Sequence, residues 1–378
     1  MQCSPPTRRL RIAQVAPLYE RVPPRLYGGT ERVVSYLTEA LVRLGHDVTL
    51  FASADSITSA RLVPQSSGAL RFDPWCEDAL AHHVRMLGQV YRRAAEFDLI
   101  HCHTDYLGLP LASLVSTPTV LTLHGRLDVA DLAPLYAQHP ETPLVSISDA
   151  QRAPLRAASW LATVYHGVPP SLFDYAPTRR GDYLLFLGRI SPEKGPETAI
   201  RVAKRAGVPL RIAAKIDPVD RHYFAEHVRP LLDPPLIEFV GEVDERRKRD
   251  LLGGARALLF PIDWPEPFGL VMIEALASGT PVIARPRGSV PEILEHGVTG
   301  LVAEDDDALV DAVKQVGDLD RAACRAAYER RFTDSAMAAR YAAVYAAIRA
   351  ERARAAGRTS SPLGVGRSMP YERPLVHR

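Results

Sequence analysis

Short apolar runs alternate with amphipathic helical patterns along most of the chain. The first run, residues 10–16, is followed by a stretch in which apolar residues recur at helical spacing from Val33 to Leu44. Thr30 is expected to cap this helix and Gly45 to end it. Buried strands that alternate with helices are typical of a parallel sheet with crossover connections, so the pattern predicts an α/β fold.

The alternation pauses near residues 170–181 and then starts again. Further strands are expected at residues 47–52, 98–103, 119–124, 144–148 and 162–166 before the pause, and at 183–188, 210–214, 237–240, 257–261 and 281–284 after it. The pattern therefore predicts two Rossmann-like domains, at 1–172 and 173–337, with an Ala-rich helix at about 338–355 that packs back on the first. The tail at 357–378 is rich in Ser, Gly, Pro and Arg and is predicted to be disordered.

The composition is that of a globular enzyme, with 378 residues, 47% hydrophobic and 24% charged. The net charge of +2 is too small to indicate a nucleic-acid partner. The 4 cysteines lack C-x-x-C spacing, so they indicate neither a zinc site nor a disulfide framework, and they fit a cytoplasmic location. No apolar run has the length of a membrane span. Peripheral membrane contact stays open because the helix expected at 82–97 is basic on one side, although a solvated face commonly explains such a pattern.

One candidate binding loop runs from Gly188 to Gly195, between an expected strand and a helix. Open α/β sheets bind their ligands at this end of the strands. Arg189 and Lys194 place two cations over the same crevice, a planar fork and a point charge that together suit a diphosphate. Taken alone, such a loop is more often ordinary protein surface.

The strongest motif has two carboxylates, Glu266 and Glu274, on either side of a helix start, with seven residues between them. The first amides of this helix, near Gly269, Leu270 and Val271, have no intrahelical partners and form an anion site. Glu274 lies about one turn further, where it can reach hydroxyl groups of a ligand whose phosphate lies at the helix tip. A merely solvated role is disfavoured because the residues around Glu274 are apolar.

Weaker signals occur at four other strand ends. Gly241 forms a turn at which backbone groups can read a base, and residues 287–292 contain a further glycine turn. Gly28 and Gly29 open the first helix as a phosphate-approach loop. That loop is not G-x-G-x-x-G, which weakens a nicotinamide-cofactor interpretation. His124 ends another strand, where a lone histidine is more often structural.

In this order, the segments 183–195, 239–243 and 265–284 resemble the retaining family 4 glycosyltransferases of the GT-B fold, in which two Rossmann-like domains with parallel sheets face a central cleft. The resemblance extends to about residue 350 and is most specific over 183–303. Glu266 and Glu274 match the E-x7-E motif of the family. His166 departs from the family, which usually has Asn there before Gly-Val.

The resemblance implies a role for each matched residue. Arg189 and Lys194 would neutralise the diphosphate leaving group, Glu274 would hold the ribose, and Glu266 would contact hydroxyls of the donor sugar. His124 matches the active-site histidine that contacts this sugar from across the cleft. The expected catalytic residues are Glu266, His124, Arg189 and Lys194, and the expected donor-binding residues are Gly28, Gly29, Gly241, Phe268, Gly269, Leu270, Val271 and Glu274.

The expected reaction is transfer of a hexosyl group from a nucleoside-diphosphate sugar to a hydroxyl acceptor, with retention and without a cofactor or metal. The acceptor is a lipid-linked saccharide, a polysaccharide or a small molecule. His101 and His103 share one strand face, but no third ligand accompanies them, so they are expected to line the acceptor side of the cleft rather than hold a metal. Three alternatives remain: a GT-B sugar phosphorylase, a nucleotide-sugar epimerase and a non-catalytic nucleotide-sugar-binding protein. The E-x7-E motif disfavours the epimerase.

Overall fold

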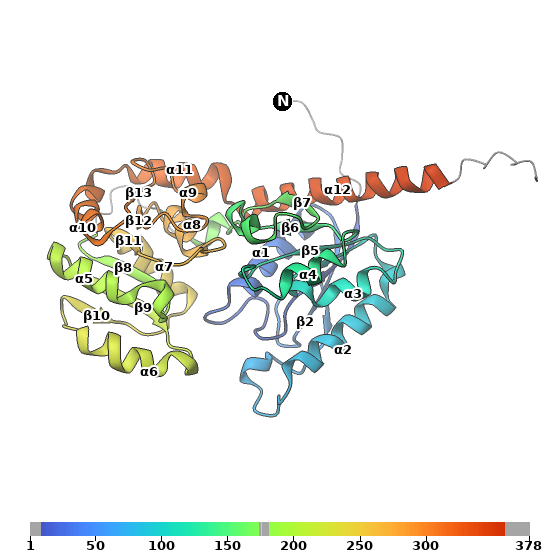
Figure 1. Cartoon of the computed structure of the whole chain (residues 1–378), viewed down its shortest axis with the longest axis horizontal. Coiled ribbons are helices and arrows are strands. Elements are labelled where there is room, and N and C mark those ends of the chain that lie inside the picture. The colour runs from blue at the N-terminus through green and yellow to red at the C-terminus, as the bar shows by residue number, and fades with distance from the viewer. Residues whose placement is uncertain (1–8, 174, 176–180, 360–378) are drawn as a thin grey trace, which may run out of the picture.

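The computed structural model describes residues 9–173, 175 and 181–359, and its strands form two parallel sheets (Figure 1). One sheet has 7 strands in the order β3-β2-β1-β4-β5-β6-β7, and the other has 6 in the order β10-β9-β8-β11-β12-β13. Every registered pair in both sheets is parallel. The predicted α/β architecture with two Rossmann-like sheets is confirmed.

The first sheet and its helices come from the N-terminal half of the chain. They are β1 (Arg11–Val15), α1 (Gly29–Arg43), β2 (Asp47–Ala52), β3 (Arg61–Pro64), α2 (Ala79–Arg92), β4 (Leu99–Cys102), α3 (Leu109–Ala112), β5 (Thr119–Thr122), α4 (Leu132–Ala137), β6 (Leu144–Ser146) and β7 (Trp160–Thr163). The helix expected at 82–97 is α2 and begins and ends earlier in the chain, and two strands differ most from the sequence pattern. β3 was not predicted, because it is a half-exposed edge strand without an apolar run, and β7 begins at Trp160 and ends at Thr163 instead of spanning 162–166.

The second sheet comes from the C-terminal half. Its elements are β8 (Leu184–Arg189), α5 (Pro196–Ala206), β9 (Leu210–Lys215), α6 (Arg221–Tyr223), β10 (Ile237–Phe239), α7 (Glu245–Gly254), β11 (Ala257–Phe260), α8 (Leu270–Ala277), β12 (Val282–Ala284), α9 (Val290–Ile293), β13 (Gly300–Val302), α10 (Asp306–Gln315), α11 (Arg321–Arg331) and α12 (Asp334–Thr359). The expected strands of this half are present, and β13 is an additional short strand at the sheet edge.

The start of α1 corrects the predicted cap. The helix begins at Gly29, so Thr30 lies inside its first turn and caps nothing. The capping position is Gly28, where a Cβ atom would lie 2.9 Å from two carbons of Pro24, so the close backbone approach requires glycine. Gly45 follows the helix with φ of +88°, as expected for a terminating glycine.

The last helix, α12, returns to the N-terminal half and lies along it (Figure 1). Tyr341 and Tyr345 of α12 are fully buried, and their hydroxyls hydrogen-bond to Thr122 (2.9 Å) and His101 (2.8 Å). α12 extends to Thr359, past the predicted helix end and into the first residues of the predicted tail. The remainder of that tail lies outside the described residues.

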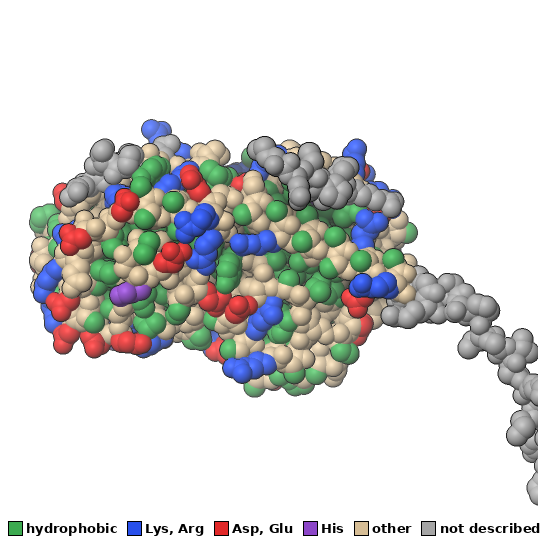
Figure 2. Space-filling view, turned by 90° about the horizontal axis from the view of Figure 1, so that it is seen from above, with side chains coloured by type: hydrophobic (Ala, Val, Ile, Leu, Met, Phe, Trp, Pro, Cys, Tyr) green, Lys and Arg blue, Asp and Glu red, His purple; other side chains and the backbone are tan. Residues whose placement is uncertain are grey.

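On the face seen in Figure 2, basic and acidic side chains are interspersed with apolar ones. No helix in the described part of the chain combines the length and apolar character that crossing a membrane requires.

Candidate active site

A cleft of about 610 Å³ lies where the carboxyl ends of strands from both halves meet. Eleven of the twelve predicted site residues line it: Gly28, Gly29, His124, Arg189, Lys194, Glu266, Phe268, Gly269, Leu270, Val271 and Glu274. The exception is Gly241, whose carbonyl accepts a hydrogen bond from Ala214 at the end of β9 (2.9 Å). Its neighbour Glu242 lines the cleft instead, so the turn contributes a side chain where the sequence had suggested backbone.

Helix α8 presents its N-terminus to this cleft. Gly269 precedes it in the left-handed region (φ 76°), and a Cβ there would lie 2.8 Å from Met272 Cε. No side chain caps the helix, and its first two residues, Leu270 and Val271, line the cleft. The exposed amide dipoles at such an end favour an anion. Phe268, only 2% exposed, anchors the loop just before it.

Glu266 is held by two partners on its own side of the cleft. Lys194 forms an ion pair with Glu266 Oε2, and the indole Nε1 of Trp264 donates a hydrogen bond to the same oxygen (2.9 Å). The ammonium of Lys194 also lies 4.6 Å from the centre of the Trp264 ring. Lys194, Trp264 and Glu266 therefore form one compact unit, which orients the carboxylate and places a cation beside it.

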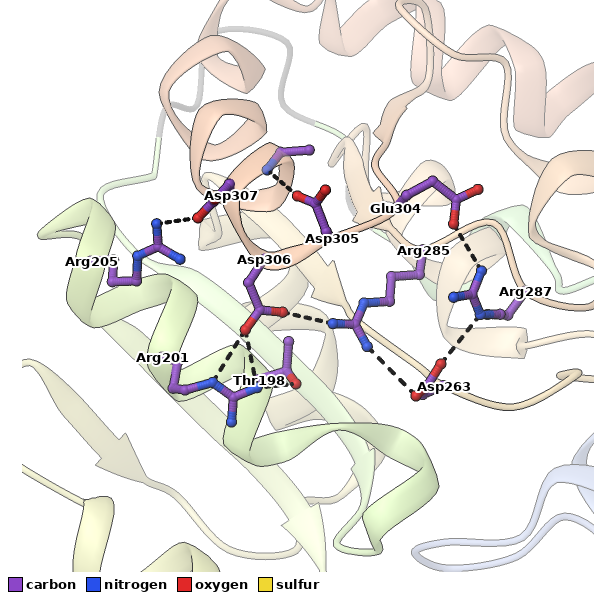
Figure 3. A network of polar contacts seen from close by, with 11 residues as sticks. Thr198, Arg201, Arg205, Asp263, Arg285, Arg287, Glu304, Asp305, Asp306 and Asp307 are labelled. Carbon is purple, nitrogen blue, oxygen red and sulfur yellow. Dashed lines mark hydrogen bonds and ion pairs between the residues drawn. The ribbon is translucent and has the colours of Figure 1, made fainter.

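The loop that carries Glu266 is tied to the rest of its domain by the network in Figure 3. Asp263 lies between Arg287 (3.3 Å) and Arg285 (4.0 Å), and its amide donates to the carbonyl of Glu193 (3.0 Å). Arg285 in turn pairs with Asp306 at the start of α10 (2.6 Å). These contacts link the loops after β8, β11 and β12, so the loop with Glu266 has a fixed base.

Arg189 enters the cleft in the company of carboxylates. Its guanidinium bonds to Glu193 (2.7 Å) and lies 3.6 Å from Asp217 and 3.9 Å from Asp220. These acids compensate the charge of Arg189. Arg189 is half-buried, so it remains accessible to a ligand that enters the cleft.

Two family descriptions match adjacent parts of the chain: Glycosyltransferase Family 4 over residues 27–177 and Glycosyl transferases group 1 over residues 173–331. The chain belongs to the family 4-like glycosyltransferases of the GT-B fold. Glycogen synthase of Mycobacterium tuberculosis is 29% identical over 412 residues, covering 91% of this chain and 96% of its own. Phosphatidyl-myo-inositol mannosyltransferase of Mycolicibacterium smegmatis is 27% identical over 363 residues, covering 86% and 89%. AviGT4, a glycosyltransferase involved in avilamycin A biosynthesis, has a similar crystal structure, with a TM-score of 0.69, 26% identity and coverage of 89% and 97%.

In this glycosyltransferase, Glu274 belongs to a chain of alternating charges that the sequence did not reveal. Lys248 of α7 bonds to Glu274 (2.6 Å) and to Glu245 (2.9 Å). Glu245 forms an ion pair with Arg32 of α1, in the other half of the protein. Glu274 is only 3% exposed, so Lys248 compensates a carboxylate that has almost no contact with water. No spacing rule could have joined α1, α7 and α8, because these contacts exist only in the folded chain.

Three histidines form the opposite wall of the glycosyltransferase cleft, and we call His103, His124 and His166 the histidine wall. His103 hydrogen-bonds to Gln14 (2.8 Å) and His124 (2.9 Å), and the ring of His124 stacks on that of His166 at 5.2 Å and 17°. Burial lowers the pKa of His124 to about 3 and those of His103 and His166 well below 6.5, so all three rings are neutral.

His166 stands where the family usually has asparagine, and the structure shows what its ring contacts. Its ring contacts Phe268 edge-on (4.7 Å), so it bridges the histidine wall and the loop that leads into α8. His101 does not line the cleft; its ring nitrogens bond to Tyr345 (2.8 Å) and Thr122 (2.7 Å) behind the wall. The expectation that both His101 and His103 line the cleft is therefore correct only for His103. Across the described residues, no three His, Cys, Asp or Glu side chains are arranged to hold a metal ion.

One further lining residue was overlooked. Glu31 follows Thr30 in the first turn of α1 and is almost fully buried. Burial raises the pKa of its carboxyl to about 7, with a smaller contribution from the nearby charge of Glu20. Gly28 and Gly29 predicted backbone contacts with a ligand, but they gave no signal for the side chain of Glu31.

Proposed function

We propose that this glycosyltransferase moves a hexosyl group from a nucleoside-diphosphate sugar to a hydroxyl acceptor, with retention of the anomeric configuration. The observation that carries the proposal is the meeting, in one cleft, of an uncapped helix N-terminus, two cations and two held carboxylates. The residues are Leu270 and Val271 at the helix tip, Arg189 and Lys194, and Glu266 and Glu274.

The diphosphate would bind at the tip of α8. Its oxygens would accept hydrogen bonds from the first amides of the helix and from Arg189 and Lys194. Both cations already lie beside carboxylates, so the ligand would replace or share these partners rather than meet bare charges. As the bond to the sugar breaks, negative charge grows on the diphosphate, and donors fixed beforehand stabilise it without rearrangement.

The two carboxylates would bind hydroxyl groups on either side of the diphosphate. Glu274, steadied by Lys248, suits the ribose, and Glu266, steadied by Trp264 and Lys194, suits the sugar. A carboxylate held in this way by two donors is better placed to orient a hydroxyl than to attack carbon. The neutral histidine wall would face the sugar from the opposite side, where His124 supplies hydrogen bonding without charge.

Retention would then follow from attack on the face that the diphosphate leaves, with a phosphate oxygen taking the acceptor proton. The transition state would resemble an oxocarbenium ion. We propose that no organic cofactor takes part and that Arg189, Lys194 and the helix tip supply the positive charge for the leaving group. The two halves of the protein would exclude water from this reaction and so limit hydrolysis of the donor.

The first test is a thermal-shift screen with UDP, GDP, ADP and their hexose conjugates in the presence of EDTA. A nucleotide at about a hundred times its dissociation constant should stabilise the fold by about 2.7 kcal/mol. Transfer to glycan acceptors with the selected donor would then be followed by NMR, which reports the anomeric configuration of the product directly. A lack of stabilisation by every nucleotide, or a product of inverted configuration, would refute the proposal.

A further inference from the structure

An exposed aromatic surface lies beside the cleft, and we call its residues Tyr19, Phe72 and Trp75 the aromatic rim. Trp75 is 88% exposed and Phe72 66% exposed, although large aromatic side chains are usually covered in a folded protein. Leu80 and Val84, at the start of α2, are exposed next to them in sequence. Several large apolar side chains exposed within so short a segment indicate a binding surface. In Figure 1 the loop that leads into α2 projects from the N-terminal half.

Hydrogen bonds hold the backbone of the aromatic rim and so fix the positions from which its side chains project. Leu70 donates to the carbonyl of Leu18 (2.9 Å), and Arg71 donates to that of Tyr19 (3.1 Å). The carboxylate of Asp73 accepts the amide of Trp75 (2.9 Å), which closes the turn beneath the indole. A backbone that is already ordered reduces the conformational entropy lost when a ligand binds.

The aromatic rim is continuous with the cleft. Tyr19, Arg71 and Leu80 line the cleft, whereas Phe72 and Trp75 extend outside it. A ligand that contacts Trp75 while one of its ends lies in the cleft therefore extends beyond the cleft lining.

The charge of the aromatic rim indicates what such a ligand is. Residues 72–84 contain three carboxylates, Asp73, Glu77 and Asp78, and neither Lys nor Arg. The arginines on either side are occupied: Arg71 pairs with Glu20 (2.7 Å) and Arg85 donates to the carbonyl of Gln65 (2.8 Å). An anionic membrane surface attracts basic segments, so this acidic one is a poor match for it.

A neutral saccharide fits the same features. The C–H faces of sugar rings pack against flat aromatic side chains, and carboxylates accept hydrogen bonds from sugar hydroxyls. We propose that the aromatic rim binds the distal units of an extended, uncharged saccharide acceptor whose reacting end lies in the cleft. This inference rests on the proposed glycosyl transfer, since it is that reaction which makes a saccharide in the cleft an acceptor.

The test compares the wild-type protein with Trp75→Ala and Phe72→Ala on an array of neutral and acidic glycans. Leu114→Ala is the matched control, because Leu114 is 74% exposed and lies outside both the aromatic rim and the cleft lining. We expect neutral glycans of three or more units to bind the wild type and the control. Binding should weaken by about tenfold or more in Trp75→Ala, the usual effect of losing a central aromatic contact. Melting temperatures would verify that all four proteins are folded.

Three results would overturn the inference. One is no binding of any neutral glycan by the wild type, and another is equal binding by the wild type and Trp75→Ala. The third is a Trp75-dependent interaction of a different kind, either with phosphatidylcholine or phosphatidylglycerol vesicles or with a second copy of the chain in light scattering. A nucleotide thermal shift on the same proteins separates the two proposals. If nucleotides stabilise every variant but glycan binding does not depend on Trp75, only the proposed role of the aromatic rim is refuted. If no nucleotide stabilises any of the proteins, the proposed donor site is refuted.

Discussion

Replacement of Trp264 by Phe tests whether Glu266 must be held in place for transfer. The substitution removes the indole N–H that donates to Glu266 Oε2 over 2.9 Å, yet it keeps an aromatic face for Lys194. A hydrogen bond to a charged group contributes about 1.5–3 kcal/mol, equivalent to about 10- to 150-fold in rate if the bond matters fully in the transition state. Because Lys194 still pairs with the carboxylate, we expect the lower end, about a tenfold fall in kcat/KM.

The assay is steady-state transfer with the donor selected by thermal shift. The fall should appear mainly in kcat, because Trp264 acts through the orientation of Glu266 rather than by binding the nucleotide. Trp160→Phe is a matched control: it also removes an indole hydrogen bond, to the carbonyl of Leu155 (2.8 Å), but on β7 and away from the cleft lining. If Trp264→Phe kept kcat/KM within twofold of the wild type, the positioning role of Trp264 would be excluded.

Three further perturbations probe the rest of the site. Lys248→Met leaves the buried carboxylate of Glu274 without its cation, so it should lower the free energy of unfolding by about 3–5 kcal/mol in denaturant titrations. The control Lys314→Met removes an exposed ion pair and should lower it by less than about 1 kcal/mol. Arg32→Ala and Glu245→Ala should each raise the KM for the donor, and a double-mutant cycle should show that the two effects are not additive. Additive effects would mean that this ion pair does not couple the two halves of the protein. Burial lowers the pKa values of the histidine wall, so below about pH 6.5 the unfolded chain binds protons that the folded chain does not. The free energy of unfolding is therefore highest above that pH and falls as the pH is lowered toward 3. Melting temperatures between pH 8 and 4 should show this slope, reduced in His166→Asn and unchanged in His222→Gln, whose side chain is 82% exposed.

The strands that were predicted and those that were missed differ in burial. β2 and β11 are apolar runs with a neighbouring strand on each side, so they are buried and their hydrophobic pattern identifies them. β3 is a half-exposed edge strand, and β13 has only three residues and begins with glycine. Neither has enough buried surface to leave a pattern in the sequence.

The site shows a similar division. Glu266 and Glu274 could be found because their spacing across a helix start is local information, which one stretch of sequence contains. Lys248 and Arg32 could not, because they reach the cleft from helices whose relative positions depend on the fold. Trp264 is an intermediate case: it lies two residues before Glu266, but only the geometry of the loop shows that its N–H meets the carboxylate.

The ion pairs of the cleft explain how the protein can keep several charges in a partly buried site before any ligand is present. Removing a charge from water costs several kcal/mol unless an opposite charge compensates it. Lys194 with Glu266, Lys248 with Glu274 and Arg189 with Glu193 provide that compensation within each pair. When a donor binds, the cations would also pair with its diphosphate, and its sugar hydroxyls would donate hydrogen bonds to the carboxylates. The helix tip would help to offset the added negative charge. The same groups would thus stabilise the empty fold and, in the complex, the charge of the leaving group, which is why their loss should affect stability and turnover together.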